Sequence, residues 1–407
     1  MTRTVAILAT VDTKGAEAAF LKEEIESLGG SAMIINLGVM DQPTIPVDIA
    51  VEEVVARGGG DFAALRKEPS RSAFNPFLVG GAIKILLEKI QSGEVNAVLS
   101  MGGTQGTSMT SAIMQALPYG FGKLIVSTAA SGDTAPFVGI KDITMMFSVG
   151  DILGLNPFLR KILANAAGAA YGMALASGRT IEPEAGCKGL IGMTNLGVLT
   201  KGAMHAIDLF HQAGYEVITF HAIGSGGRAM EQMAEEGLLA GIFDYALGDV
   251  ADTCYGALRS TDAHRLTVAG KLTLPQVVVP GGTEHLGLLV AENTVPEEYK
   301  DHLMTWHSPV IFVPRLTGDE SRKVAEAIGQ RLSHTTAKAA FMIPLKGVSR
   351  YSTAGGELHD PASDAAFFQA LREQLPKSMP IEEFDNGAED DAFVEACVSK
   401  LISIIEN

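Results

Sequence analysis

Glycine and hydroxyl residues gather where one apolar stretch of the chain ends. The segment LSMGGTQGTSM, residues 99–109, reads as an apolar strand that leads through three glycines and two threonines into a helix. Glycine lets a backbone approach a ligand closely, and unpaired N–H groups at a helix N-terminus favour phosphate. The candidate phosphate ligands are the backbone amides of Gly102, Gly103 and Gly106, supported by the hydroxyls of Thr104 and Thr107. The spacing is neither Walker A nor GxGxxG, so a glycine turn that only packs a helix on a sheet is the structural alternative.

Three further polar segments follow strand-like runs in the same half of the chain. In TVDTKG, residues 10–15, Asp12 and Thr13 could cap the next helix and Lys14 could pair with an anion; a plain cap with a solvated lysine is the simpler explanation. The other segments are STAASGDTAPF, residues 127–137, which contains Ser131 and Asp133, and SVGDILGLN, residues 148–156. Asp12 or Asp133 could hold Mg²⁺, or could merely cap a turn. Together the four segments favour a phosphate-bearing ligand.

The second half of the chain carries a different set of polar residues after its strand-like runs. The segment FHAIGSGGRAMEQMAEEG, residues 220–237, opens a helix with serine and glycine, and VVVPGGTEHLG, residues 277–287, places a Glu/His pair after an apolar strand. Such a pair can act as acid and base because imidazole titrates near neutrality, whereas two adjacent metal ligands are geometrically awkward. The candidate substrate-binding residues are Ser225, Gly226, Gly227, Arg228, Gly281, Gly282 and Thr283; the candidate catalytic residues are Glu284, His285 and Lys346.

Composition narrows the class of protein. The chain has 407 residues, of which 47% are hydrophobic, and a formal net charge of −16. A nucleic-acid partner is excluded because phosphate contact needs a positive face. No apolar run reaches the roughly 18 residues of a membrane span, and the apolar run near the first residue predicts a strand rather than a signal peptide. Three cysteines without CxxC spacing favour a reducing cytoplasm over a disulfide framework. The serine-hydrolase pattern GxSxG does not occur.

The elements that must position these residues alternate regularly. Apolar runs of five to eight residues alternate with helical patterns, which predicts βαβ units and two Rossmann-like lobes, each a mainly parallel sheet with helices on both faces. Such sheets bind ligands beyond the carboxyl ends of their strands. The expected strands are 4–10, 32–37, 95–101, 123–128 and 142–148 in the first half, and 189–194, 216–221, 242–247, 276–280, 309–313, 339–344 and 380–384 in the second. A charged segment, 177–189, predicts lobes of residues 1–182 and 183–407.

Five segments in this order resemble a known family. ATVDTKGAE, SMGGTQGTSM, GDILGLN, FHAIGSGGRAME and PGGTEH together make the chain similar to the Tm-one-like ATP-binding domain family over nearly its whole length. The resemblance implies two Rossmann-like lobes, ATP bound by the N-terminal lobe, and a homodimer. It does not imply a particular reaction.

Two functions fit these observations. The first is nucleotide binding, with the phosphates of ATP at residues 102–107 and Mg²⁺ as a possible companion. The second is an enzyme that acts on a small anionic metabolite between the lobes, with Glu284 and His285 as acid and base and with Arg228 and Lys346 holding the anion.

Overall fold

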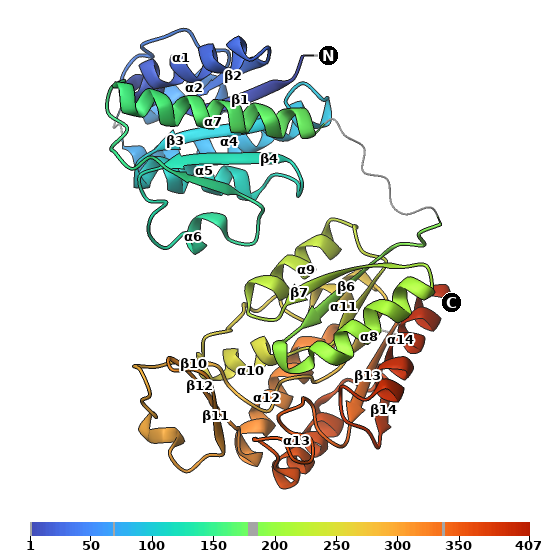
Figure 1. Cartoon of the computed structure of the whole chain (residues 1–407). Helices are drawn as coiled ribbons and strands as arrows, with labels where there is room; N and C mark the ends of the chain where they lie inside the picture. The colour runs from blue at the N-terminus through green and yellow to red at the C-terminus, as the bar shows by residue number, and fades with distance from the viewer. Residues whose placement is uncertain (1, 68–69, 178–185, 336–337) are drawn as a thin grey trace. The chain divides into compact units, whose positions relative to one another are not determined.

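The computed structural model describes residues 2–67, 70–177, 186–335 and 338–407. The chain divides into two compact units, Met1–Ile181 and Glu182–Asn407. The boundary expected at residues 182 and 183 lies outside the described residues. Each unit contains a parallel sheet between layers of helices (Figure 1), which confirms the expected α/β architecture.

The N-terminal lobe is built on a five-stranded parallel sheet in the order β2-β1-β3-β4-β5. The strands are β1 (Thr4–Ala9), β2 (Ser31–Asn36), β3 (Ala97–Gly102), β4 (Gly122–Ser127) and β5 (Thr144–Phe147). The central strands are apolar on both faces, because helices cover both sides and each alternate side chain is buried. In β1, Ile7 packs with the helices of one face and Leu8 with those of the other.

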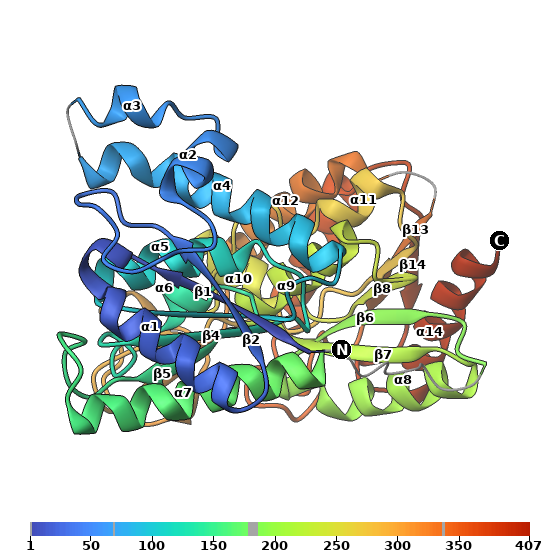
Figure 2. The ribbon, with the colours of Figure 1, turned by 90° about the horizontal axis from the view of Figure 1, so that it is seen from above.

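The helices of this lobe form two layers. The helices α1 (Val11–Ser27) and α7 (Pro157–Ala176) cover one face and lie side by side in Figures 1 and 2. The other face is covered by α2 (Val51–Arg57), α4 (Arg71–Gln91) and α5 (Thr104–Gln115). Two short helices, α3 (Phe62–Leu65) and α6 (Ala135–Val138), complete the lobe.

The C-terminal lobe repeats the same strand order with one strand added. Its sheet runs β7-β6-β8-β9-β13-β14, so its first five strands follow the pattern of the N-terminal sheet. The strands are β6 (Leu190–Asn195), β7 (Glu216–His221), β8 (Gly241–Asp244), β9 (Gln276–Val278), β13 (Ala339–Pro344) and β14 (Ile381–Phe384). The helices α8 (Thr200–Gln212) and α14 (Asp391–Glu406) cover one face. The opposite face carries α9 (Ser225–Glu235), α10 (Gly248–Tyr255), α11 (Val268–Leu272), α12 (Gly318–Arg331) and α13 (Pro361–Gln374).

The expected strand at 309–313 is present, but it belongs to a different sheet. The run 309–313 does not join the parallel sheet: β12 (Ile311–Pro314) is the centre of a separate antiparallel sheet with β10 (Leu288–Leu289) and β11 (Met304–Ser308). Only two residues, Pro309 and Val310, join β11 to β12, and so short a connection permits only antiparallel pairing. No helix among the described residues is long and apolar enough to cross a membrane.

A buried ionic cluster lies at the carboxyl end of β8. The Arg265 guanidinium, with 0% exposure, binds the carboxylates of Asp244 and Asp249, the latter at 2.8 Å from Nε to Oδ2. Glu231 Oε1 lies 3.7 Å from Arg265 Nη1, and the Glu231 carboxylate accepts hydrogen bonds from the N–H groups of Leu266 and Val268. Burial raises the pKa of Glu231 to about 7, against the opposing attraction of Arg265. The buried carboxylates of this cluster therefore depend on the positive charge of Arg265.

Replacing Arg265 by methionine should destabilise the C-terminal lobe by about 3–5 kcal/mol, because it leaves buried carboxylates without their partner. Trp306, the single tryptophan of the chain, lies in this lobe and reports its urea unfolding by fluorescence. The matched control is Arg228→Met, which breaks an exposed pair with Asp262 and should cost at most about 1 kcal/mol. Equal unfolding midpoints for the two variants would contradict the stabilising role of Arg265.

Candidate functional site

A cavity of about 610 Å³ opens at the carboxyl ends of β1 and β3 in the N-terminal lobe. The helix that follows β1 covers one face of the sheet, and the helix that follows β3 covers the other. Adjacent strands with such diverging connections leave a crevice at their ends, the usual ligand site of an open α/β sheet. The volume lies within the range of small-molecule sites.

The glycine turn forms one wall of this cavity. Gly102 ends β3, and Gly103 precedes α5 with φ −77° and ψ −169°. A Cβ atom on Gly103 would meet only Thr128 Oγ1, at 3.8 Å. Packing therefore does not require glycine at position 103. The first N–H groups of a helix have no partner within it, so those of α5 are available to a ligand at this wall.

Most of the expected phosphate-binding residues come together here. Those that line the cavity are Asp12, Thr13, Lys14, Gly102, Gly103, Thr104 and Gly106. Thr107 does not line it, because its buried hydroxyl lies 2.7 Å from the Ser127 hydroxyl. Ser131 and Asp133 are also outside the lining, and Asp133 accepts the Ala135 N–H at 3.0 Å.

Asp12 is the one carboxylate among the described residues that line the cavity, and it does not cap α1. Its Oδ2 accepts the Met40 N–H at 3.0 Å and the Asp41 N–H at 3.4 Å, which holds the segment after β2 in place. Its Oδ1 is buried beside Gly38 and has no hydrogen-bond partner within the described ranges. Mg²⁺ in nucleotide sites commonly takes one or two carboxylates, water and phosphate oxygens. Asp12 fits that ligand set, whereas Asp133 lies elsewhere.

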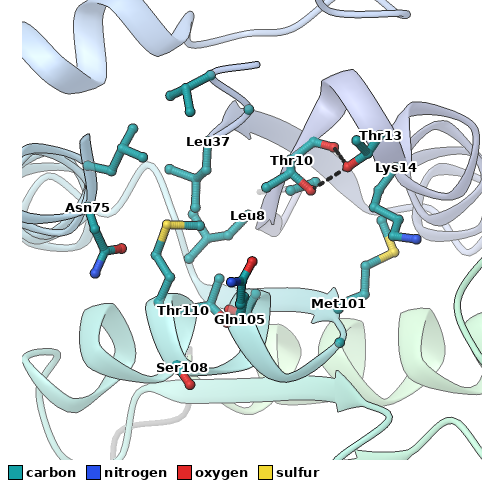
Figure 3. A pocket seen from close by; sticks show the side chains of 18 of the residues that line it. Leu8, Thr10, Thr13, Lys14, Leu37, Asn75, Met101, Gln105, Ser108 and Thr110 are labelled. Carbon is teal, nitrogen blue, oxygen red and sulfur yellow. Dashed lines mark hydrogen bonds between the residues drawn. The ribbon is translucent and has the colours of Figure 1, made fainter. Parts of the chain in front are cut away.

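Lys14 is the one lysine or arginine among the described side chains that line the cavity. Its ammonium group donates to the Ile152 carbonyl, so the segment 148–156 supplies a backbone acceptor. Figure 3 shows Lys14 beside Thr10 and Thr13, whose hydroxyls are 3.0 Å apart. Ammonium has three donors, so Lys14 can hold Ile152 and still reach an anion.

No sequence motif marked the opposite wall of the cavity. It comes from α4, through Ser72, Asn75 and Leu78, and from Leu37 and Val39 after β2. Figure 3 shows Asn75 across the cavity from Lys14. Periodicity predicts that α4 exists, but it cannot say that the start of this helix reaches the end of β1.

In the C-terminal lobe the expected substrate-binding glycines pack against the chain itself. A Cβ atom on Gly226 would lie 2.1 Å from the His221 carbonyl oxygen, and one on Gly227 would lie 2.4 Å from Arg265 Nε. Gly281 is similarly tight against the Tyr245 carbonyl, and Gly282 has φ +69°. These glycines have structural reasons to be glycine that involve no ligand.

The polar residues around them are also paired within the chain. Arg228 binds Asp262 at 2.9 Å, and Lys346 binds Asp385 at 2.8 Å on the surface. Thr283 is buried and donates to the Pro280 carbonyl at 2.8 Å. Ser225 begins α9.

Glu284 and His285 lie together in a buried network. Their exposed fractions are 3% and 4%, and His285 Nδ1 is 2.9 Å from Glu284 Oε1. Ser349 donates to the same carboxylate oxygen, and Arg259 binds the His285 carbonyl at 2.9 Å. Burial alone would raise the pKa of Glu284, but His285, the Arg315 charge and the Ser349 hydroxyl lower it to about 2. An ionised, buried carboxylate of this kind anchors the loop 280–287.

The Glu284 carboxylate makes acid stability testable. Its pKa in the folded protein, about 2, is below the ordinary value of 4.5, so its stabilising effect is complete above pH 4.5 and is lost as pH falls toward 2. Glu284→Gln should remove a contribution on the order of 3 kcal/mol at pH 7 and should flatten the loss of stability between pH 5 and pH 3. Urea unfolding followed at Trp306 measures both effects. The exposed Glu357→Gln is the control, and identical pH profiles for the two variants would refute the interpretation.

No group of three or more His, Cys, Asp or Glu side chains in the described ranges could hold a metal ion by itself.

Comparison with known proteins gives a consistent family. The models described as "Uncharacterised protein family (UPF0261)", N-terminal domain and C-terminal domain, match residues 3–179 and 188–405. A UPF0261 protein of Clostridium tetani is 37% identical over 407 residues and covers all of both chains. The tomato "ToMV susceptible protein tm-1(GCR26)" is 28% identical over 90% of this chain and 50% of its own. The structure of a Methanocaldococcus jannaschii UDP-GlcNAc 2-epimerase aligns over 99% of this chain and all of its own, at 9% identity. The TM-score of this alignment, 0.19, is too low to indicate a shared fold.

With both family models matched in order and the Clostridium tetani relative similar over its full length, the chain belongs to the UPF0261 family, in agreement with its resemblance to the Tm-one-like proteins.

Proposed function

We propose that the N-terminal lobe binds a nucleotide, ATP, at the cavity between the ends of β1 and β3. The observation that carries the proposal is that three features coincide. They are a crevice at the ends of two adjacent strands whose following helices cover opposite faces, a volume of about 610 Å³, and a wall made of the glycine turn and the start of α5. Main-chain N–H groups at such a helix start favour phosphate. The identity of the base rests on the family resemblance.

In this proposal each lining residue has a defined part. The amides of Gly102, Gly103 and Gly106 bind phosphate oxygens, the hydroxyls of Thr13 and Thr104 support them, and Lys14 neutralises charge. Thr107 instead fixes α5 to β4 through Ser127. Asp12 Oδ1 would hold Mg²⁺ together with the phosphates. A homodimer rests on the resemblance, and a cytoplasmic location rests on the scattered cysteines.

The alternative, an enzyme with Glu284 and His285 as acid and base, has less support. Both side chains are more than nine-tenths buried and bound to each other and to neighbours, which a role in anchoring the loop explains.

Gly103→Val should weaken the binding of ATP–Mg²⁺ by about tenfold or more, which is ~1.4 kcal/mol, because the new side chain covers the phosphate wall. The fold should tolerate the change, since the nearest atom to a Cβ at this position is 3.8 Å away. Isothermal titration calorimetry measures the affinity. The matched control is Gly168→Val in α7, where a Cβ meets no atom within 4 Å. Wild-type affinity in Gly103→Val would eliminate the proposed phosphate wall.

Asp12→Asn separates the metal from the phosphate contacts. The amide oxygen can still accept the Met40 N–H, but it binds Mg²⁺ more weakly than a carboxylate does. We expect the affinity for ATP to fall by about tenfold in Mg²⁺ and to show no such fall in EDTA, where the variant removes a negative charge that would otherwise repel the phosphates. Asp133→Asn, outside the cavity, should change neither value. If Asp133→Asn rather than Asp12→Asn loses the effect of Mg²⁺, the metal ligand is misassigned.

A further inference from the structure

A second cavity, of about 440 Å³, lies between α13 and the segment that follows β13 in the C-terminal lobe. We infer that it binds a small zwitterion in which an apolar chain separates an ammonium group from a carboxylate group. The volume is within the range of small-molecule sites. Because the cavity belongs to the C-terminal lobe alone, the inference does not depend on nucleotide binding by the N-terminal lobe.

One face of α13 supplies a carboxylate, an aromatic ring and a guanidinium group in turn. Asp364, Phe368 and Arg372 follow one another at intervals of four residues, so they share a face of the helix, and all three line the cavity. The rise from the first to the last is about 12 Å, and a helical side chain leans toward the N-terminus. Groups of opposite charge therefore stand at two ends of one cavity, with an apolar surface between them.

Asp364 provides an acceptor at one end. The residue is only 5% exposed, and its Oδ1 accepts a hydrogen bond from Arg315 Nη2 at 2.7 Å. Its Oδ2 has no hydrogen-bond partner in the described part of the chain. Burial raises the pKa of Asp364 to about 6; the charge of Arg315 opposes this rise, and those of Glu284 and Asp360 add to it. A buried carboxylate with one unpaired oxygen at a cavity wall favours a cationic donor.

His359 adds a second acceptor to the lining. Its Nδ1 lies 2.8 Å from the Ser352 carbonyl oxygen, which can only accept, so Nδ1 carries the proton of the neutral ring. The other ring nitrogen, Nε2, is then an acceptor. An ammonium group has three donors, enough for Asp364 and His359 together.

Lys346 and Arg372 provide the positive charge of the cavity. Lys346 binds Asp385 at 2.8 Å, and Arg372 Nε binds Glu383 at 2.5 Å. Both cations are thus held at the carboxyl end of β14, beside each other's partner. Lysine has three donors and arginine five, and exposed ion pairs of this kind contribute little to stability. A ligand carboxylate can therefore join these pairs without breaking them.

The two ends together exclude a ligand with a single charge. An anion that reaches along the cavity meets the Asp364 carboxylate, and a cation meets Lys346 and Arg372. Leu345 and Phe368 supply apolar surface for the part of the ligand between its charges. The chemistry that matches all three features is that of an ω-amino carboxylate, with an amine at one end of a methylene chain and a carboxylate at the other.

The test uses four probes of similar size on the full chain, by isothermal titration calorimetry. They are 6-aminohexanoate, its isomer 2-aminohexanoate with adjacent charges, and the single-charge analogues hexanoate and hexylamine. Wild type should bind 6-aminohexanoate about tenfold or more tightly than each of the others. Asp364→Asn keeps an oxygen for Arg315 but loses the charge, so it should bind 6-aminohexanoate and hexanoate within about twofold of each other.

A second pair of variants tests the cavity without touching a polar contact. Ala365 is exposed and lines the cavity, so Ala365→Leu should fill it and weaken 6-aminohexanoate at least about tenfold. The matched control is Ala362→Leu, exposed on the same helix outside the lining, which should behave as wild type. Urea unfolding followed at Trp306 shows whether each variant is folded.

Three results would overturn the inference. They are failure of 6-aminohexanoate to bind wild type, equal binding of 6-aminohexanoate and hexanoate by wild type, and wild-type affinity in Ala365→Leu. None of them bears on ATP, which the same calorimetry measures separately.

Discussion

The structure of the N-terminal lobe depends on two adjacent parallel strands whose following helices lie on opposite faces of the sheet. The chain leaves β1 toward one face of the sheet and leaves β3 toward the other, so no helix crosses the gap between their carboxyl ends. The cavity, the exposed start of α5 and the position of Asp12 all follow from that divergence. Because the sheet between the helices is apolar on both faces, polar chemistry is confined to its edge.

The C-terminal lobe has the same strand order and the same divergence, between β6 and β8, but it fills the equivalent place with its own side chains. The Arg265 guanidinium binds Asp244 at the end of β8 and the Ala246 carbonyl just beyond, while Thr194 of β6 lies 2.7 Å from Asp244. Gly227 at the start of α9 packs on Arg265. A helix start that would suit an external anion is thus used to hold an internal ionic cluster. The strand order creates the site, and the side chains decide whether a ligand can enter it.

This contrast explains what could be predicted from the sequence. Periodicity identified the parallel strands and their flanking helices, because burial on both faces leaves a local pattern. It could not distinguish Gly103, which leaves open space, from Gly227, which another part of the chain fills, since both read as glycine at a helix start. By position, Thr107 was assigned to a phosphate ligand and Asp12 to a helix cap or a Mg²⁺ ion. The partner of Thr107 is Ser127 and that of Asp12 is Met40, and both come from distant segments. The wall of α4 was missed for the same reason: its contact with the strand ends is long-range.

An acidic protein that binds a polyanion needs a local solution to the charge. The net charge is −16, and the described side chains that line the cavity include one lysine and one aspartate, whose charges give no net attraction there. Main-chain N–H groups of α5 provide partial positive charge without any added cation. They cannot by themselves neutralise a triphosphate, and Asp12 beside them would repel it. In the proposed complex, a divalent cation between Asp12 and the phosphates would reverse the sign of that repulsion, and the orphaned Asp12 oxygen would then belong to the binding site rather than obstruct it.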